Sequence, residues 1–457
     1  MISLEDWNAR IDAFIREENK NRGKTVPVHR IYCQDDSDRS GGGIYNETVT
    51  VDTIGRFARA LGDSNPLYSD PRYRAGQAGT ACQGLFPAPP LLECCICSTF
   101  IGGRMPRLRG ISAFDAGSRW ERFLPILPGD SFSAQTTFLG VREITRQSAG
   151  QTDAARLLLR EHRIDLTNQR GEHVSAITAR CMIRCAAPLN EDPAAQMAPD
   201  CISRRTLAED SQESCREPSP ENPQGSCRES SPADLRGLSQ VLSQQPVQPV
   251  QNSRPRYREE ELDRVYANLD AQLSGAFRRG SRPRYWEDVE VGEQVPEQII
   301  GPYDESDGQA LMAAIGAANA FATKWGSIRF RKGQGVTDPE TGAHRHPIDR
   351  HSSDLIARAQ GHPRALVSGI HSQALLAKSI SDWMGDDGRL RTLDCRCLKP
   401  LYYGDLSLQR GRVTGRFEQD GRCFVNLHME AVRQDGTVHT TAEAVVELPS
   451  RRTCQPS

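Results

Sequence analysis

The chain has 457 residues, with 57 Lys and Arg against 59 Asp and Glu, so its formal net charge is −2. This balance excludes the basic footprint of a nucleic-acid-binding protein or a polybasic membrane patch, and no run approaches the roughly 20 apolar residues that span a bilayer. The start, residues 1–6, is acidic and amphipathic, unlike a secretory signal. We therefore expect a cytoplasmic protein that has neither a nucleic-acid partner nor a membrane partner.

The composition changes along the chain and divides it into five segments. In chain order these are an N-terminal extension, a first domain, a low-complexity linker, a second domain with a leading helix, and a tail: 1–50, 51–187, 188–257, 258–449 and 450–457. The linker is rich in Ser, Pro and Gln and cannot bury enough apolar surface to offset its ordering entropy, so we expect it to be disordered. Apolar periodicity predicts helices over 4–18, 51–62, 90–101, 258–277, 306–322 and 370–384.

Two stretches of the chain repeat one pattern. Residues 157–179 and 425–446 each read as a long strand, a tight Gly turn and a second alternating strand, which is typical of a hairpin. A Pro-x-x-x-Gly-Asp motif precedes each hairpin, at 125–130 and at 400–405. The sequence therefore predicts two related domains, each with antiparallel strands packed on an apolar helix, which is an α+β architecture.

The 14 cysteines do not favour disulfides or zinc. Those in apolar helical or strand-like runs are Cys94, Cys95, Cys97, Cys181, Cys185, Cys395 and Cys397. Their spacings do not match the paired CxxC pattern of zinc sites. We expect them to pack as small buried hydrophobic residues.

A chemical motif ends the first predicted helix. Residues 62–68 read Gly-Asp-Ser-Asn-Pro-Leu-Tyr, in which Gly stops the helix and Asp63, Asn65 and Pro66 favour a turn that bonds to its own backbone. This motif resembles the Gly-Asp-x-Asn-Pro-(Ile/Leu)-His motif of the MaoC-like acyl dehydratases. Trp120 and the 125–130 motif resemble the FAS1-like dehydratase domain of the same group.

The resemblance implies two tandem hotdog domains, each an antiparallel sheet wrapped around a central helix, that form an intramolecular pseudo-dimer. It also implies an enoyl-CoA-type hydratase or 3-hydroxyacyl dehydratase that works by general acid–base catalysis. The partner would be a small acyl thioester carried on coenzyme A, with no further cofactor and no metal ion. In the family the motif Asp and His hold a water molecule. Asp63 matches that Asp, but Tyr68 stands in place of the His, and a phenol with a pKa near 10 is a poor proton shuttle.

The second half offers a different candidate. His351 precedes Gly361 by the spacing that the family motif His has from a following Gly, so it resembles the catalytic His. Asp349 is a displaced candidate for its carboxylate partner, because His346 stands five residues before His351, where the Asp is expected. Three interpretations remain open for this His-rich stretch: a catalytic His351, a solvated polar loop, or a weak metal site.

The second core helix begins after Ser368-Gly369, where the family has His-Gly. Helix N-termini carry free N–H groups and a positive dipole end, so Gly369 is the predicted oxyanion site for a thioester carbonyl. Ser368 and His371 are candidates for contacts with the substrate. Either could equally be a helix cap or a packed side chain. A basic stretch, Arg329, Arg331 and Lys332, would meet a coenzyme A phosphate or form a solvated loop.

Because neither half shows an intact Asp and His pair, two further functions stay open. One is a non-catalytic acyl-binding partner. The other is a hotdog enzyme repurposed for isomerisation, cyclisation or thioester hydrolysis, since fold alone does not fix function. The carrier (coenzyme A, acyl carrier protein or a free acid) and a homodimeric state also stay open.

Overall fold

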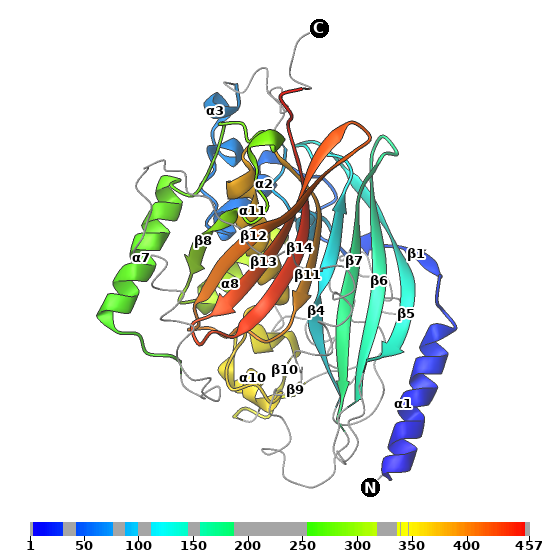
Figure 1. Cartoon of the computed structure of the whole chain (residues 1–457). Helices are drawn as coiled ribbons and strands as arrows, with labels where there is room; N and C mark the ends of the chain where they lie inside the picture. Colours follow the sequence, from blue (N-terminus) through cyan, green and yellow to red (C-terminus); the bar gives the residue numbers. More distant parts are fainter. Residues whose placement is uncertain are drawn as a thin grey trace, which may run out of the picture.

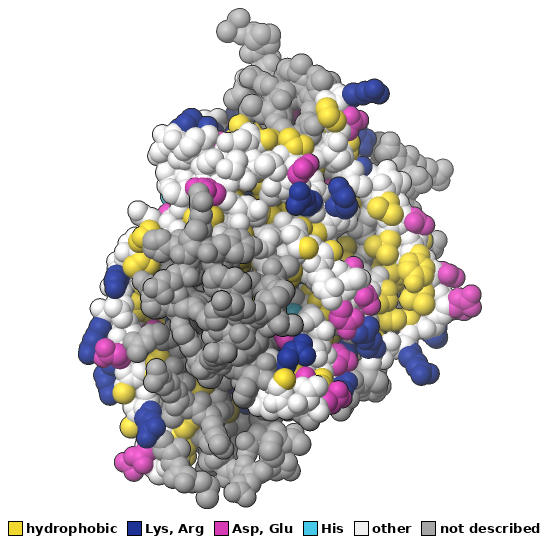
Figure 2. Space-filling model, turned by 180° about the vertical axis from the view of Figure 1, so that it is seen from behind, with side chains coloured by type: hydrophobic (Ala, Val, Ile, Leu, Met, Phe, Trp, Pro, Cys, Tyr) yellow, Lys and Arg dark blue, Asp and Glu magenta, His cyan; other side chains and the backbone are white. Residues whose placement is uncertain are grey.

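The computed structural model describes residues 3–30, 43–75, 87–98, 111–144, 156–186, 254–317, 336–338, 340–345 and 347–452. A ten-stranded antiparallel sheet dominates it and curves around a long helix (Figure 1). Within these residues no helix is both long and apolar enough to cross a bilayer. On the face shown in Figure 2, Lys and Arg side chains are interspersed with acidic ones.

The order of strands in the sheet is β1-β5-β6-β7-β4-β11-β14-β13-β12-β8. The first half contributes β1 (Thr25–Pro27), β4 (Ile111–Arg122), β5 (Phe132–Glu143), β6 (Arg156–Asn168) and β7 (His173–Cys185). The second half contributes β8 (Gln294–Ile300), β11 (Arg389–Cys397), β12 (Ser407–Gln419), β13 (Arg422–Arg433) and β14 (Val438–Leu448). Read outward from the β4–β11 junction, the two halves have the same topology. The internal repeat predicted from the two hairpins is therefore confirmed.

The repeat extends to single hydrogen bonds in the two Pro-x-x-x-Gly-Asp motifs. Asp130 and Asp405 each accept a bond from the backbone N–H three residues earlier, at 2.9 and 3.0 Å. Each also binds a glutamine from its hairpin turn, Gln169 at 3.2 Å and Gln434 at 2.8 Å. In both halves the motif therefore links the start of one strand, β5 or β12, to the turn of the hairpin that follows it, β6–β7 or β13–β14.

The helices and short elements complete the fold. The helices are α1 (Leu4–Asn19), α2 (Val51–Ala60), α3 (Pro71–Ala75), α4 (Glu93–Ile96), α7 (Glu259–Ser274), α8 (Glu305–Ile315), α10 (Asp354–Ala359) and α11 (Gly369–Met384). The 3-10 turns are η1 (Pro66–Tyr68), η3 (Trp286–Asp288) and η4 (Pro347–His351), and two small sheets pair β2 (His29–Arg30) with β3 (Gly43–Ile44) and β9 (Val336–Thr337) with β10 (His344–Arg345).

Helix α11 is the central helix of the molecule. Every residue from Ile370 to Met384 is buried, and the helix contacts strands of both halves, including β4, β8 and β11. A helix that is buried on every face, rather than on one stripe, is enclosed by the structure around it. A curved antiparallel sheet around a buried helix, repeated in tandem, is the α+β double hotdog arrangement that the sequence predicts.

The outer helices occupy matching places in the two halves. Helix α1 packs on β5 through Trp7 and Ile11, and α7 packs on β8 and its neighbours through Val265 (Figure 1). The segment 1–50, which the sequence sets apart as an extension, also supplies β1, and β1 stands in the first half where β8 stands in the second. The first half of the sheet thus begins before residue 51.

Two predicted helices differ from the structure. Within its described part, up to residue 98, the helix expected over 90–101 is only α4, because Leu91 has a φ of +67° and Cys97 is extended and bridges to Ile44. The helix expected over 306–322 ends at Ile315, since Gly316 takes the left-handed conformation (φ +80°) that stops a helix. The cysteines of the sequence analysis are free and buried, apart from the half-buried Cys397.

The two motif aspartates provide a matched stability prediction. Asp405 forms an ion pair with Arg364 at 2.7 Å, and these side chains are 1% and 3% exposed, whereas the partner of Asp130, Arg170, is 51% exposed. We expect Asp405→Ala to lower the free energy of unfolding by about 3–5 kcal/mol, because a buried guanidinium loses its counter-charge. Asp130→Ala should cost about 1–2 kcal/mol. Urea denaturation of both variants checks this, and equal losses would contradict it.

Candidate active site

The first-half motif folds as the sequence predicts. Gly62 (φ +62°) ends α2, and the Asp63 carboxylate accepts a bond from the backbone N–H of Asn65 at 2.9 Å. The side-chain oxygen of Asn65 in turn accepts from the N–H of Leu67 at 3.0 Å and starts η1. Because both side chains bond locally, the motif is a rigid bend that presents Tyr68 to the interior.

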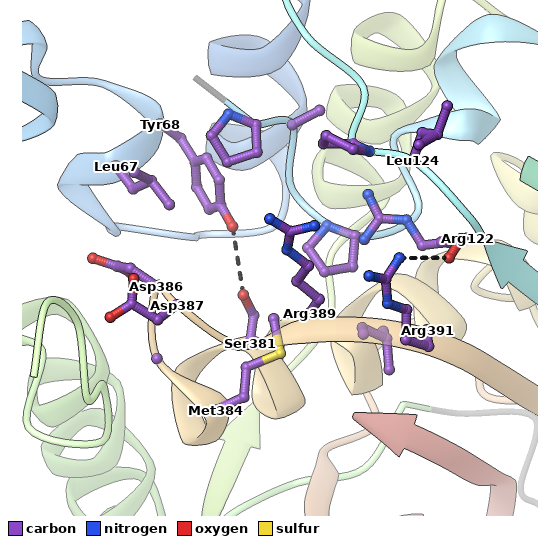
Figure 3. Close-up of a pocket in the computed structure, with 17 residues that line it drawn as sticks. Leu67, Tyr68, Arg122, Leu124, Ser381, Met384, Asp386, Asp387, Arg389 and Arg391 are labelled. Carbon is purple, nitrogen blue, oxygen red and sulfur yellow. Dashed lines mark hydrogen bonds between the residues drawn. The ribbon is translucent and has the colours of Figure 1, made fainter. Parts of the chain in front are cut away.

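The motif faces the C-terminal end of α11, which belongs to the other half. The hydroxyls of Tyr68 and Ser381 lie 3.4 Å apart across a pocket (Figure 3), and the side chain of Asn65 donates to Asp386 at 3.0 Å. Ala88 also lines this pocket, whose cavity volume is about 80 Å³. We call this place the first site.

A buried polar network lies beside the first site, and sequence reasoning missed it. The ammonium of Lys378 contacts Asp382 at 3.1 Å and the side-chain oxygen of Gln298 at 2.9 Å, and Gln298 donates to Asp382 at 2.8 Å. Burial and the Asp382 carboxylate together raise the pKa of Asp63 to about 6, although Lys378 acts to lower it. The i, i+4 spacing of Lys378 and Asp382 on a predicted helix indicates an ion pair, and this was the sequence signal that could have revealed the network.

Among the described residues, no long helix starts at the first site. The residues before α4 are Pro87, Ala88, Pro89 and Pro90, three of which have no N–H to donate. Helix α4 itself is a single turn. Burial also raises the pKa of Tyr68 far above its usual 10, so its hydroxyl stays protonated at neutral pH. This site can hold a ligand, but it is poorly equipped to stabilise an enolate.

The second site is the N-terminus of α11. Ser368 is its N-cap residue by backbone conformation, but its side chain forms no capping bond. The hydroxyl of Ser368 and the Nδ1 atom of His371 are buried, and neither has a hydrogen-bond partner among the described residues. Burial lowers the pKa of His371 to about 4, so its ring is neutral at pH 7. A buried polar atom left unpaired costs about 1–3 kcal/mol, so these two groups are candidates for hydrogen bonds to a ligand.

His351 lies at this site, but it is not paired with Asp349. Its Nδ1 atom donates to the carbonyl of Leu366 at 2.8 Å, and the guanidinium of Arg350 faces its Nε2 atom at 3.5 Å. Burial and the charge of Arg350 lower the pKa of His351 to about 3. The pairing expected of Asp349 is wrong, because its carboxylate binds Arg345 at 2.7 Å.

A carboxylate of the first half reaches the second site, and sequence reasoning missed it. Asp115, on β4, accepts from the N–H of Gly117 at 2.8 Å and from the side chain of Gln373, on the second turn of α11, at 3.2 Å. A Cβ atom added to Gly369 would lie 2.5 Å from the nearer Asp115 oxygen. The structure therefore brings together Gly369, Gln373 and Asp115.

Some candidates lie outside the described residues. These are His346 and the basic stretch Arg329, Arg331 and Lys332. Within the described ranges, no group of three or more His, Cys, Asp or Glu side chains is arranged to hold a metal ion.

Comparison with known proteins agrees with this architecture. Residues 42–177 match the model of the FAS1-like dehydratase domain region, whereas no curated protein matches the sequence. A solved structure described as a MaoC-like dehydratase covers 94% of this chain and 99% of its own, with a TM-score of 0.51 and 15% identity. A MaoC domain protein dehydratase from Chloroflexus aurantiacus J-10-fl covers 94% and 96%, with a TM-score of 0.45 and 14% identity. The chain therefore has the double hotdog fold seen in a MaoC-like dehydratase structure, and residues 42–177 of its first half are similar to the FAS1-like dehydratase domain region.

Proposed function

We propose that the protein adds water to, or removes it from, the C2–C3 bond of an acyl thioester at the second site, with the substrate carried on coenzyme A. The observation that carries this proposal is the start of the buried helix α11, where the Ser368 hydroxyl and the Nδ1 atom of His371 have no hydrogen-bond partner among the described residues. The FAS1-like dehydratase match over residues 42–177 and the MaoC-like fold support the same reaction class.

The start of α11 suits the chemistry of an enolate. The first N–H groups of a helix have no partner within it, and the dipole of a 16-residue helix such as α11 places partial positive charge there. A thioester carbonyl bound at Gly369 would gain negative charge when the C2 proton leaves. Burial strengthens the stabilisation of that charge, because the surroundings have a low dielectric constant.

Turnover of a substrate panel tests the proposal. Short- and long-chain 2-enoyl thioesters of coenzyme A and of acyl carrier protein are mixed with the full chain, and loss of absorbance by the conjugated double bond is followed. We expect hydration to the 3-hydroxyacyl thioester, identified by its mass. Binding without turnover would favour an acyl-binding partner, and release of free thiol would favour thioester hydrolysis.

The first site gives a prediction about chain length. Helix α11 is about 24 Å long, so an acyl tail that starts at Gly369 reaches the Ala88 pocket only if it is long. Each methylene buried there contributes about 0.8 kcal/mol. We expect Ala88→Phe to lower kcat/KM for the longest enoyl thioesters and to leave short ones nearly unchanged.

The control for this variant is Ala88→Ser, which keeps the volume of the side chain nearly constant. It should leave the chain-length preference as in the wild type. An equal loss for short and long substrates in Ala88→Phe would show that Ala88 does not line the acyl path.

A further inference from the structure

A β-bulge aims one carboxylate across the junction between the two halves. The register of β4 against β7 shifts between Asp115 and Ser118, and Gly117 within this bulge has a φ of +94°. A Cβ atom on Gly117 would lie 2.1 Å from the carbonyl oxygen of Cys395 on β11, so the bulge is pressed against the second half. Bulges re-aim side chains and are common beside active sites.

The bulge directs Asp115 to the first turn of α11, where its carboxylate is held in a fixed orientation. One oxygen accepts from the N–H of Gly117 at 2.8 Å and the other from the side chain of Gln373 at 3.2 Å. The amide of Gln373 is itself oriented, because its oxygen accepts from the indole of Trp120 at 3.1 Å. A carboxylate has about four acceptor positions, so these two donors leave it able to accept a further hydrogen bond, such as one from a water molecule.

The charge state of Asp115 suits proton transfer. Burial raises its pKa to about 6, although the Gly117 N–H and the Arg350 guanidinium both act to lower it. The other titratable groups that interact with it are thiols, the buried Cys181 on β7 and Cys395 on β11 and the half-buried Cys397 on β11. A carboxyl whose pKa is near the working pH is mostly ionised at pH 7 and still accepts and returns a proton.

His351, in contrast, is poorly placed for this role. One ring nitrogen donates to a backbone carbonyl, and the other faces the guanidinium of Arg350. Its ring ties η4 to the segment that leads into α11, and this makes it a positioning residue.

We propose that Asp115, supplied by the first half, is the general acid and base of the second-half site. This inference rests on the proposed hydration reaction. In hydration, the Asp115 carboxylate takes a proton from water while the water oxygen bonds to C3, and the C2=C3 electron pair moves into the thioester as an enolate. The protonated Asp115 then gives the same proton to C2. Dehydration runs these steps in reverse, so one carboxyl balances the reaction.

The test is Asp115→Asn in the full chain, assayed by hydration of a short 2-enoyl-CoA. We expect kcat to fall by about 10²–10⁴-fold, with the same unfolding midpoint and the same affinity for a saturated acyl-CoA. Wild-type kcat/KM should rise with pH through about 6, since the ionised carboxylate is the base, and this limb should vanish in the variant. The matched control is Asp165→Asn, because Asp165 is a half-exposed aspartate on β6 that binds Arg163 and His173.

The outcomes are distinguishable. If the wild type turns over substrate and Asp115→Asn is equally active, this inference alone is overturned. It is also overturned if the rise of kcat/KM with pH disappears in His351→Ala but persists in Asp115→Asn. A wild type without turnover overturns the proposed function and this inference with it. If Asp115→Asn does not fold, Asp115→Glu keeps the charge but moves it by one methylene, and we expect it to lose at least about tenfold in kcat.

Discussion

Gly117→Ala is expected to lower the free energy of unfolding by about 3–5 kcal/mol. The added methyl group would lie 2.1 Å from the carbonyl oxygen of Cys395 and 2.9 Å from the Cα atom of Arg396. Both are backbone atoms of β11, so relief requires the two strands at the junction to separate. The φ of +94° adds strain, because side chains other than glycine rarely adopt it.

Gly171→Ala is the control for this experiment. Gly171 also has a positive φ, +77°, but a Cβ atom there meets nothing within 4 Å. Gly171→Ala should therefore lower the free energy of unfolding only by the backbone strain, about 1–2 kcal/mol. Urea denaturation of the two variants separates the cost of the steric clash from the cost of the backbone strain. If both variants lost the same free energy of unfolding, the close contact between β4 and β11 would not contribute to the cost of Gly117→Ala.

Gly369→Ala is expected to lower kcat by about 10²-fold, because a displacement of about 1 Å at a reacting group has an effect of this size. Its methyl group would lie 2.5 Å from the nearer oxygen of Asp115 and 2.9 Å from its carboxyl carbon, so the carboxylate must move away. Gly369 has no positive φ, and the atoms that must move belong to one side chain rather than to the backbone. The free energy of unfolding should therefore fall by about 1–3 kcal/mol, less than in Gly117→Ala.

Gly55→Ala is the control here. Gly55 also lies in a helix, α2, and a Cβ atom there meets nothing within 4 Å. It should keep wild-type kcat and gain stability, because alanine in a helix is favoured over glycine by about 1 kcal/mol. If Gly369→Ala behaved like this control, Asp115 and the start of α11 would not act together.

The repeat and the fold class were predictable because their signals are local. The hairpin turns and the Pro-x-x-x-Gly-Asp motifs rest on bonds between residues that are close in sequence, as the bond from the Leu127 N–H to Asp130 shows. Helix α11 was predictable for the same reason. It is a long apolar run that ends before Gly385, and the structure begins it at Gly369.

The short first-half helix was not predictable, because tertiary pairing overrides its apolar pattern. Cys97 leaves the helix to bridge Ile44, and the N–H of Tyr45 bonds to the carbonyl of Ile96 at 2.8 Å. These partners lie about fifty positions away in the sequence. A window of apolar residues cannot distinguish this bend from a continuing helix.

The candidate site was predicted in part. The start of α11 and the bend at Asp63 follow from helix and turn chemistry, but the partners of the acidic groups do not. Asp349 binds Arg345 rather than His351, and Asp115 reaches Gln373 only because the two halves join at β4 and β11. Contacts across the junction leave no periodic trace in either segment.

The most direct test compares the two sites in a single assay. The central claim is that the chemistry occurs at the start of α11 and not at the first-half motif, although burial raises the pKa of Asp63 to about 6 as well. The measurement is kcat/KM for a short 2-enoyl-CoA in Asp63→Asn and in Gly369→Ala. We predict a loss of at most about threefold in Asp63→Asn and about 10²-fold in Gly369→Ala. The reverse order would contradict the account and place the reaction beside Tyr68.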